Sequence, residues 1–121
     1  MSRKLDAAIA EALGYEVREV KRHSCGYIAI FPFLFVDGVN KGRLPRYSAD
    51  GNDMLELERE MHQRGYALNI AFYHIQKRER FYCVCVYEGV NKIIAKVDAD
   101  TMPKAVALAA YKALTGKEWS E

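Results

Sequence analysis

The chain lacks a long apolar run and a large excess of either charge. Its longest apolar run, Tyr27 to Val36, contains Pro32 and is ten residues long, about half of what a membrane-spanning helix needs. Eighteen basic and sixteen acidic residues give a formal net charge of +2, well below the excess typical of small nucleic-acid-binding domains. We therefore expect no membrane partner, and charge alone does not define another one.

Cysteine is scarce as well. The sequence has three cysteines, Cys25, Cys83 and Cys85, and the odd number argues against a complete disulfide framework. Cys83 and Cys85 alternate on a predicted strand, so both thiols lie on one face, where they cannot bridge each other without distortion. Free thiols are typical of a reducing compartment. The opening residues, Met1 to Asp6, also lack the apolar segment of a secretory signal, so we expect a cytoplasmic protein.

Half of the 121 residues are apolar, which is enough for the core of one domain. The clearest predicted element is a helix from Thr101 to Leu114. Thr101 suits the N-cap, Pro103 suits the first turn, and Gly116 suits the left-handed position after the helix. One apolar stripe follows the helical spacing, and its alanines allow close packing on a flat partner, which we expect to be a sheet. The stripe consists of Met102, Ala105, Val106, Ala109 and Ala113.

Periodicity and turn residues predict the other elements. A first helix is capped by Ser2 and stops at Gly14. A middle helix begins at Ser48 or Asp50, runs to about Arg64, and turns Met54, Leu55, Leu57 and Met61 toward the core. Pro32 indicates a bulge, an edge or a break in its strand. The predicted strands are Tyr15–Lys21, Tyr27–Val36, Tyr66–Ile75, Phe81–Tyr87 and Ile93–Val97.

The predicted order is therefore α-β-β-α-β-β-β-α. We predict a single α/β (α+β) domain over residues 1–121, in which three helices pack on a mostly antiparallel sheet. A helix–Gly–Tyr–strand order occurs at residues 13–17 and again at 64–68. A capping glycine followed by an aromatic residue that packs back on the helix accounts for both, so we infer no internal repeat.

Three stretches resemble the phage ABA (alpha-beta-alpha) sandwich domain family of small phage and prophage proteins. Residues 5–15 resemble its opening helix, 45–50 (Pro-Arg-Tyr-Ser-Ala-Asp) its Pro-x-Tyr-Ser-Thr-Asp segment, and 99–105 its Ala-Asp-Thr-x-Pro-x-Ala helix entry. Ala49 and Lys104 depart from the pattern, as does the lack of a tryptophan in the middle helix. The resemblance implies a phage-type origin, the host cell cytosol and an architecture, but it implies no reaction.

Basic residues mark the candidate binding loops. Residues 39–47 show no periodicity and predict an exposed basic loop, and residues 76–80 predict a charged turn. Cations beside an aromatic residue suit phosphates or single-stranded bases. The candidate ligand or nucleic-acid-binding residues are Lys41, Arg43, Arg46, Tyr47, Lys77, Arg78 and Arg80.

Other constellations have simpler explanations. Thiolate and imidazole groups suit zinc, but the spacing fits no usual zinc pattern, and Cys83 and Cys85 suit small core residues. A Cys83 or Cys85 nucleophile with His74 as base conflicts with an apolar strand. Asp98 and Asp100, with Glu88 nearby, suit a cation, yet capping explains the helix start. We assign no catalytic residue, cofactor or metal.

The expected function is that of a non-enzymatic phage or prophage accessory protein that binds a host protein, a nucleotide or a nucleic acid. Interference with a host defence system would fit such an origin. One alternative is a double-stranded-RNA-binding-like module, because residues 81–114 resemble the second half of that domain, although only Lys104 matches its lysine cluster. The other is a small hydrolase or nuclease. Exposed sheet edges further predict a homodimer.

Overall fold

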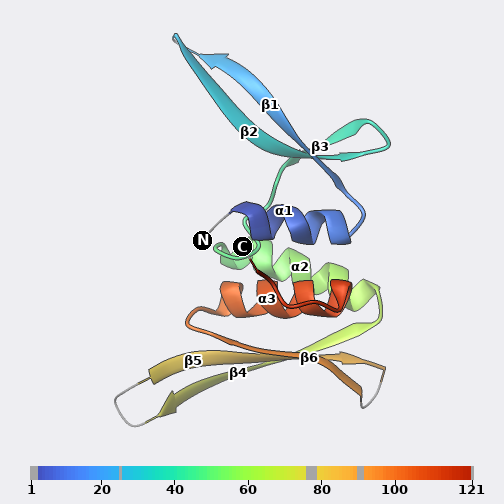
Figure 1. Ribbon diagram of the computed structural model, residues 1–121, viewed down its shortest axis with the longest axis vertical. Helices are drawn as coiled ribbons and strands as arrows, with labels where there is room; N and C mark the ends of the chain where they lie inside the picture. The colour runs from blue at the N-terminus through green and yellow to red at the C-terminus, as the bar shows by residue number, and fades with distance from the viewer. Residues whose placement is uncertain (1–2, 25, 76–78, 90–91, 121) are drawn as a thin grey trace.

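The computed structural model describes residues 3–24, 26–75, 79–89 and 92–120 (Figure 1). The predicted α+β class is confirmed, with one strand more than expected. The elements are α1 (Arg3–Ala12), β1 (Glu16–Ser24), β2 (Tyr27–Val36), β3 (Val39–Arg43), α2 (Gly51–Gln63), β4 (Tyr66–Ile75), β5 (Glu79–Glu88), β6 (Lys92–Ala99) and α3 (Met102–Thr115).

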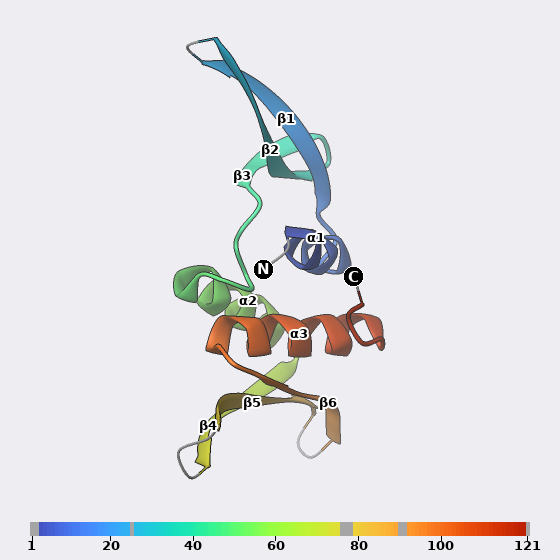
Figure 2. The same ribbon diagram turned by 60° about the vertical axis from the view of Figure 1, so that its left-hand side comes forward.

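The strands form two antiparallel sheets of three strands each. The first sheet has the order β1-β2-β3 and the second has the order β4-β5-β6. The three helices lie between the two sheets, which occupy opposite ends of the molecule (Figures 1 and 2). The prediction of one sheet is therefore corrected to two. No helix in the described part of the chain is long and apolar enough to cross a bilayer.

The additional strand is β3, where the sequence predicts an exposed loop over residues 39–47. Asp37 (φ 51) and Gly38 (φ 79) both have positive φ, and Val36 pairs with Val39 across them. Two such residues form the tight turn that matches the twist of a hairpin. The Asp-Gly dipeptide is therefore a hairpin signal rather than a strand end.

The helix α3 is at the centre of the molecule. It contacts β5 and β6 on one side and both α1 and α2 on the other (Figure 2). Thr101 caps its start and Gly116 (φ 74) ends it, as predicted. Ala105 and Ala109 are fully buried, as the predicted stripe requires, and Ala113 is half-buried. Ala107 and Ala110 are fully buried too, because the other helices cover the side of α3 that faces away from the sheet.

The helix α2 packs on α3 through Met54, Leu57 and Met61, all of which are buried as predicted. Leu55 was expected beside them but is 51% exposed, because it lies on the outer side of the helix. Asp50 is the N-cap and accepts hydrogen bonds from the backbone N–H groups of Asn52 and Asp53. Ser2, the predicted cap of α1, lies outside the described residues.

The element order reveals an internal repeat that the sequence interpretation did not infer. A helix followed by a three-stranded antiparallel meander occurs twice, as α1 with the first sheet and as α2 with the second. Each helix is followed by a glycine of positive φ, Gly14 (φ 99) and Gly65 (φ 92). The repeat is also visible as Asp-Gly-Val-Asn-Lys at 37–41 and Glu-Gly-Val-Asn-Lys at 88–92.

The repeat is broken by the helix that follows each meander. α3 follows the second sheet and covers it, whereas α2 follows the first sheet but packs on α3 and beside β4. The β1–β2 hairpin consequently extends beyond the helices (Figure 1), and Ile28 and Ile30 of that hairpin are 63% and 50% exposed. The first sheet is thus the less covered half of the repeat.

The close approach of α3 to its neighbours yields a prediction. Ala109→Leu inserts a branched side chain at a fully buried position where neighbouring elements leave no room for it. Overpacking of this kind lowers the free energy of unfolding by about 1–3 kcal/mol. Ala113→Leu, at the half-buried end of α3, is the matched control. Urea unfolding followed by circular dichroism measures both. Equal midpoints for Ala109→Leu and wild type would contradict the packing.

Candidate binding surface on the first sheet

The face of the first sheet that points away from the helices is aromatic. Side chains alternate along a strand, and on β2 Leu34 belongs to the main core. Phe31, Phe33 and Phe35 therefore point to the opposite face. Because no helix covers this face, other side chains must shield the three alternating phenylalanines from water.

Two arginines supply that cover. Arg18 of β1 and Arg43 of β3 are both the cross-strand neighbours of Phe33. The Cζ atom of Arg43 lies 4.5 Å from the ring centroid of Phe31, and that of Arg18 lies 4.7 Å from the ring centroid of Phe35. Both distances are within cation–π range. We call these five residues the Phe–Arg face.

The cover is uneven from one ring to the next. Phe33, between the two arginines, is only 4% exposed, while Phe31 and Phe35 are half-buried. Arg18 and Arg43 are themselves exposed. The outward surface consequently offers guanidinium groups above and between aromatic rings, and both kinds of group are accessible to a ligand.

An ion pair orients Arg18. Its Nε and Nη2 atoms donate to the two carboxylate oxygens of Glu16 at 2.6 and 2.8 Å. This hydrogen bonding lowers the pKa of Glu16 and raises that of Arg18. Both groups are exposed to solvent, so the pair sets direction more than stability. In this pair the edge of the Arg18 guanidinium group points to the Glu16 carboxylate, and its plane lies over the ring of Phe35.

The formal net charge of +2 comes from the segment that forms this sheet. Residues 16–43 contain five basic and three acidic residues, and the remaining thirteen basic and thirteen acidic residues balance. A local excess attracts anions even when the net charge of the protein is small. The first sheet is therefore the more cationic part of the chain.

The structure places the residues of the predicted basic loop in different surroundings, because residues 39–43 form β3. Lys41 and Arg43 are exposed on β3, and Arg46 is exposed on the connector that follows. Arg43 joins the Phe–Arg face. Tyr47, by contrast, is 3% exposed and packs in the main core, so the prediction that it lies in an exposed loop is wrong. Its ring supplies the apolar contact that holds the connector down, and burial, followed by the charge of Glu60, raises its pKa.

The second predicted basic cluster lies mostly outside the described residues. Lys77 and Arg78 lie outside the described residues, and so does the side chain of Arg80, although its backbone is part of β5. Sequence reasoning missed Arg18 and the three phenylalanines. Their signal is the Phe-x-Phe-x-Phe spacing of residues 31–35 combined with an arginine on each neighbouring strand.

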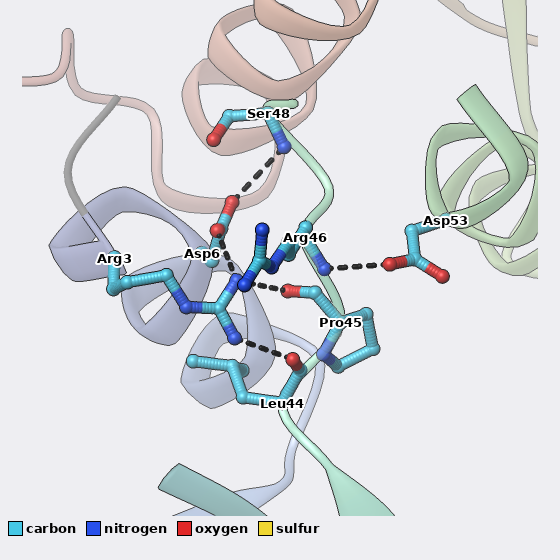
Figure 3. Close-up of polar contacts among 7 residues, drawn as sticks. All are labelled: Arg3, Asp6, Leu44, Pro45, Arg46, Ser48 and Asp53. Atoms are coloured by element: carbon cyan, nitrogen blue, oxygen red, sulfur yellow. Dashed lines mark hydrogen bonds and ion pairs between the residues drawn. The ribbon is translucent and has the colours of Figure 1, made fainter. Parts of the chain in front are cut away.

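A buried carboxylate fixes the connector between β3 and α2 (Figure 3). Asp6 of α1 is 1% exposed; it accepts a hydrogen bond from Arg3 Nη1 at 2.8 Å and from the Ser48 N–H at 3.0 Å. Arg3 also donates to the carbonyls of Leu44 and Pro45. The connector is thus bound to α1 through charge-assisted hydrogen bonds, which are stronger than neutral ones.

Pro32 explains why the Leu44 carbonyl is free for Arg3. The Leu44 N–H donates to the Pro32 carbonyl at 3.0 Å, as in an antiparallel ladder. A residue other than proline in β2 would return an N–H to Leu44, but proline has none. The predicted irregularity at Pro32 is therefore the end of β3 pairing, and the orphaned carbonyl is satisfied by Arg3.

A second link joins the other ends of α1 and α2. The Tyr15 hydroxyl donates to Glu60 Oε1 at 2.6 Å, and Arg64 donates to the Leu13 carbonyl. The hydrogen bond to Glu60, with burial, raises the pKa of Tyr15. With both ends linked, α1 is held in place beneath the first sheet, which positions the Phe–Arg face.

The cysteines lie on the other sheet, with properties that disfavour nucleophilic chemistry. Cys83 is buried and Cys85 is half-buried on the face of β5 opposite Val84 and Val86. Burial, together with the hydrogen bond and negative charge of Asp98, raises the pKa of Cys83 to about 11. A nucleophilic thiol needs the opposite shift. Within the described residues there is no group of three or more potential metal ligands.

The helix start at α3 is a cap rather than an acidic site. Thr101 Oγ1 accepts from the Lys104 N–H at 3.3 Å, and Lys104 Nζ lies 3.7 Å from Asp100. That pairing also occupies the one lysine that matches the double-stranded-RNA-binding pattern. Because α3 is covered by a sheet and two helices, it presents little surface to an RNA duplex.

A hollow of about 300 Å³ lies between β6, α3 and the C-terminal residues. Trp119 borders it and packs edge-on against Tyr111, with ring centroids 5.2 Å apart. Lys112 and Glu118 pair across 3.3 Å. Its other charged residues, Lys96 and Asp98, are exposed. The hollow is small and its charges balance, so it is a weaker candidate for a ligand-binding site than the Phe–Arg face.

The buried carboxylate generates a matched pair of predictions. Asp6→Ala removes the acceptor of the Ser48 N–H and the charged acceptor of Arg3, which keeps only the two carbonyls. The free energy of unfolding should therefore fall by about 2–4 kcal/mol. Ser48→Ala keeps that N–H and removes a buried hydroxyl that has no hydrogen-bond partner among the described residues. It should change stability by less than about 1 kcal/mol. Urea denaturation separates the two, and equal losses would contradict this geometry.

The thiol prediction concerns pH. Because the pKa of Cys83 is raised, its thiolate is rare near neutrality, and alkylation by iodoacetamide should speed up about tenfold per pH unit until roughly pH 11. Asp98→Asn removes the negative charge and should lower the pKa, so alkylation at about pH 8 becomes faster. Peptide mass spectrometry distinguishes Cys83 from Cys85. Fast alkylation of wild type at neutral pH would contradict the assignment.

Comparisons with protein-family models, with curated proteins and with solved structures found no match. The resemblance to the phage sandwich family therefore stays a prediction, and the function rests on the geometry of the chain.

Proposed function

We propose that this protein is a non-catalytic binding protein whose Phe–Arg face binds single-stranded nucleic acid. The observation that carries the proposal is the pair of cation–π contacts, Arg43 over Phe31 and Arg18 over Phe35, on an uncovered antiparallel sheet. Stacking on aromatic rings and guanidinium planes is the usual way in which proteins hold unpaired bases. The cationic excess of the first sheet supports the same ligand.

The shape of the surface favours a single strand over a duplex. An open sheet presents ring faces to bases that are already unstacked, whereas the bases of a duplex are hidden inside it. Exposed Arg18, Lys41 and Arg43 lie along the sheet, where they suit the phosphates of an extended strand. Few cations are involved, so the affinity should be modest and sensitive to salt.

The enzymatic alternative has no support in the described geometry. Cys83 has a pKa shifted away from reactivity, and the hollow beside Trp119 holds a balanced set of mostly exposed charges. A phage or prophage accessory role, with interference in host defence, remains compatible with a nucleic-acid-binding surface. Its basis is the sequence resemblance alone.

The test is fluorescence anisotropy with labelled oligo(dT) and oligo(rU) of on the order of ten nucleotides. Wild type should bind, and the logarithm of the binding constant should fall with log salt with a slope of roughly −1.4 to −2.1 if two or three phosphates are contacted. Phe31→Leu keeps an apolar side chain but loses the ring, and should weaken binding roughly 5- to 100-fold.

Variants of Arg43 separate charge from stacking. Arg43→Ala should weaken binding about as much as Phe31→Leu, and Arg43→Lys should recover only part of the loss, because lysine keeps the charge without the planar group. Lys96→Ala on β6 removes the same charge from the second sheet and is the control. A folded wild type that binds neither oligonucleotide at low salt would refute the proposal, as would equal losses in Arg43→Ala and Lys96→Ala.

A further inference from the structure

The two sheets have four edge strands, and one of them lacks protection. β1 carries several charges, including Arg18, Glu19 and Lys21, β3 has five residues of which two are basic, and β6 carries Lys92, Lys96 and Asp98. Charged and short edges resist pairing with other chains. β4 runs for ten residues, Tyr66–Ile75, without a single aspartate, glutamate, lysine, arginine or proline.

The internal repeat makes the difference sharper, because β1 and β4 are equivalent strands. On the face that points to the helices, Val17 pairs with Leu34 in the first sheet as Leu68 pairs with Val86 in the second. Continuing along each strand, Glu19 corresponds to Ile70 and Lys21 to Phe72. The same edge is therefore charged in one half of the chain and apolar in the other.

A groove with mixed polar and apolar lining lies directly beside the β4 edge. A hollow of about 410 Å³ is bordered by Leu55, Glu58, Arg59 and His62 of α2 and by Tyr66 and Leu68 of β4. Leu55 is 51% exposed, and Phe72, further along β4, is 54% exposed. Within the described residues, β4 pairs only with β5, so its outer backbone edge and this groove are open together.

We propose that β4 pairs antiparallel with β4 of a second copy of this chain across a two-fold axis. This pairing joins the two second sheets into one continuous sheet of six strands. A register centred on Ile70 places Ile70 opposite itself and Leu68 opposite Phe72 of the second copy, all on the face of the sheet that points to the helices. On the other side Asn69 meets Ala71. Apolar side chains therefore meet apolar side chains on the helix-facing side of the joined sheet.

Charge identifies the occupant as a second copy. The strand has no aspartate, glutamate, lysine or arginine, and the groove contributes one acid, Glu58, one base, Arg59, and the imidazole of His62. A two-fold interface places the same patch on both sides, and a patch with balanced charges meets its own copy without net repulsion. Leu55 and Phe72 of both copies would lose their exposure.

This inference is independent of nucleic-acid binding. The second sheet is at the opposite end of the molecule from the first (Figure 1), so pairing through β4 leaves both Phe–Arg faces open. Failure of either proposal does not decide the other, because one is read from oligonucleotide binding and the other from the mass of the protein in solution.

The experiment measures that mass by sedimentation velocity and light scattering from low to high micromolar concentrations. Wild type should be a dimer. Phe72→Lys places on β4 the residue that β1 carries at the equivalent Lys21, and should raise the dimer dissociation constant at least about tenfold. Asn69→Lys, at an exposed position on the opposite face of β4, should weaken the dimer in the same direction.

Ile28→Lys is the matched control, since Ile28 is 63% exposed on the distant hairpin and its replacement should leave the dimer intact. Circular dichroism verifies that each variant is folded, and hydrogen exchange of wild-type β4 amides should slow as concentration rises. A monomeric wild type at high micromolar concentration overturns the proposal and points to a peptide from another protein at this edge. Loss of the dimer in Ile28→Lys alone overturns it as well.

Discussion

The structure depends on how closely the layers approach the helix α3. Ala105, Ala107, Ala109 and Ala110 are all fully buried, and an alanine keeps no atoms beyond Cβ between its backbone and the neighbouring element. A sheet on one side and two helices on the other can therefore pack against the same 14-residue helix. Larger residues would force one of these layers outward. The small side chains of α3 thus set the thickness of the whole molecule.

That arrangement leaves one sheet with a helix across it and the other without. The first sheet is joined to the helices near Leu34 and the connector, and its outward face has no helix to bury three phenylalanines. Arginines over the rings keep that face soluble, since a guanidinium group is weakly hydrated and stacks on aromatic rings. The same chemistry that covers the rings also suits nucleic-acid bases, so the cover and the proposed ligand compete for one surface.

Local signals allowed much of the fold to be predicted. Thr101, Pro103 and Gly116 mark both ends of α3, and the bounds of β2 and β4 agree with the predicted strands because turns flank long apolar runs. β3 was missed because a five-residue strand shows no periodicity. The Phe–Arg face was missed because β2 is apolar on both faces, and alternation does not tell which face is covered. Tyr47 illustrates the same limit, since a tyrosine among cations reads as exposed until its burial is known.

Pro32 has a consequence for the path of the chain. The Leu44 N–H donates to the Pro32 carbonyl, but Pro32 has no amide hydrogen to donate to the Leu44 carbonyl in return. Arg3 donates to that carbonyl instead. β3 therefore has a fixed length, and the backbone must leave the sheet at that residue and turn toward α2. The lack of one amide hydrogen in the middle strand therefore determines where the first half of the molecule ends and the second half begins.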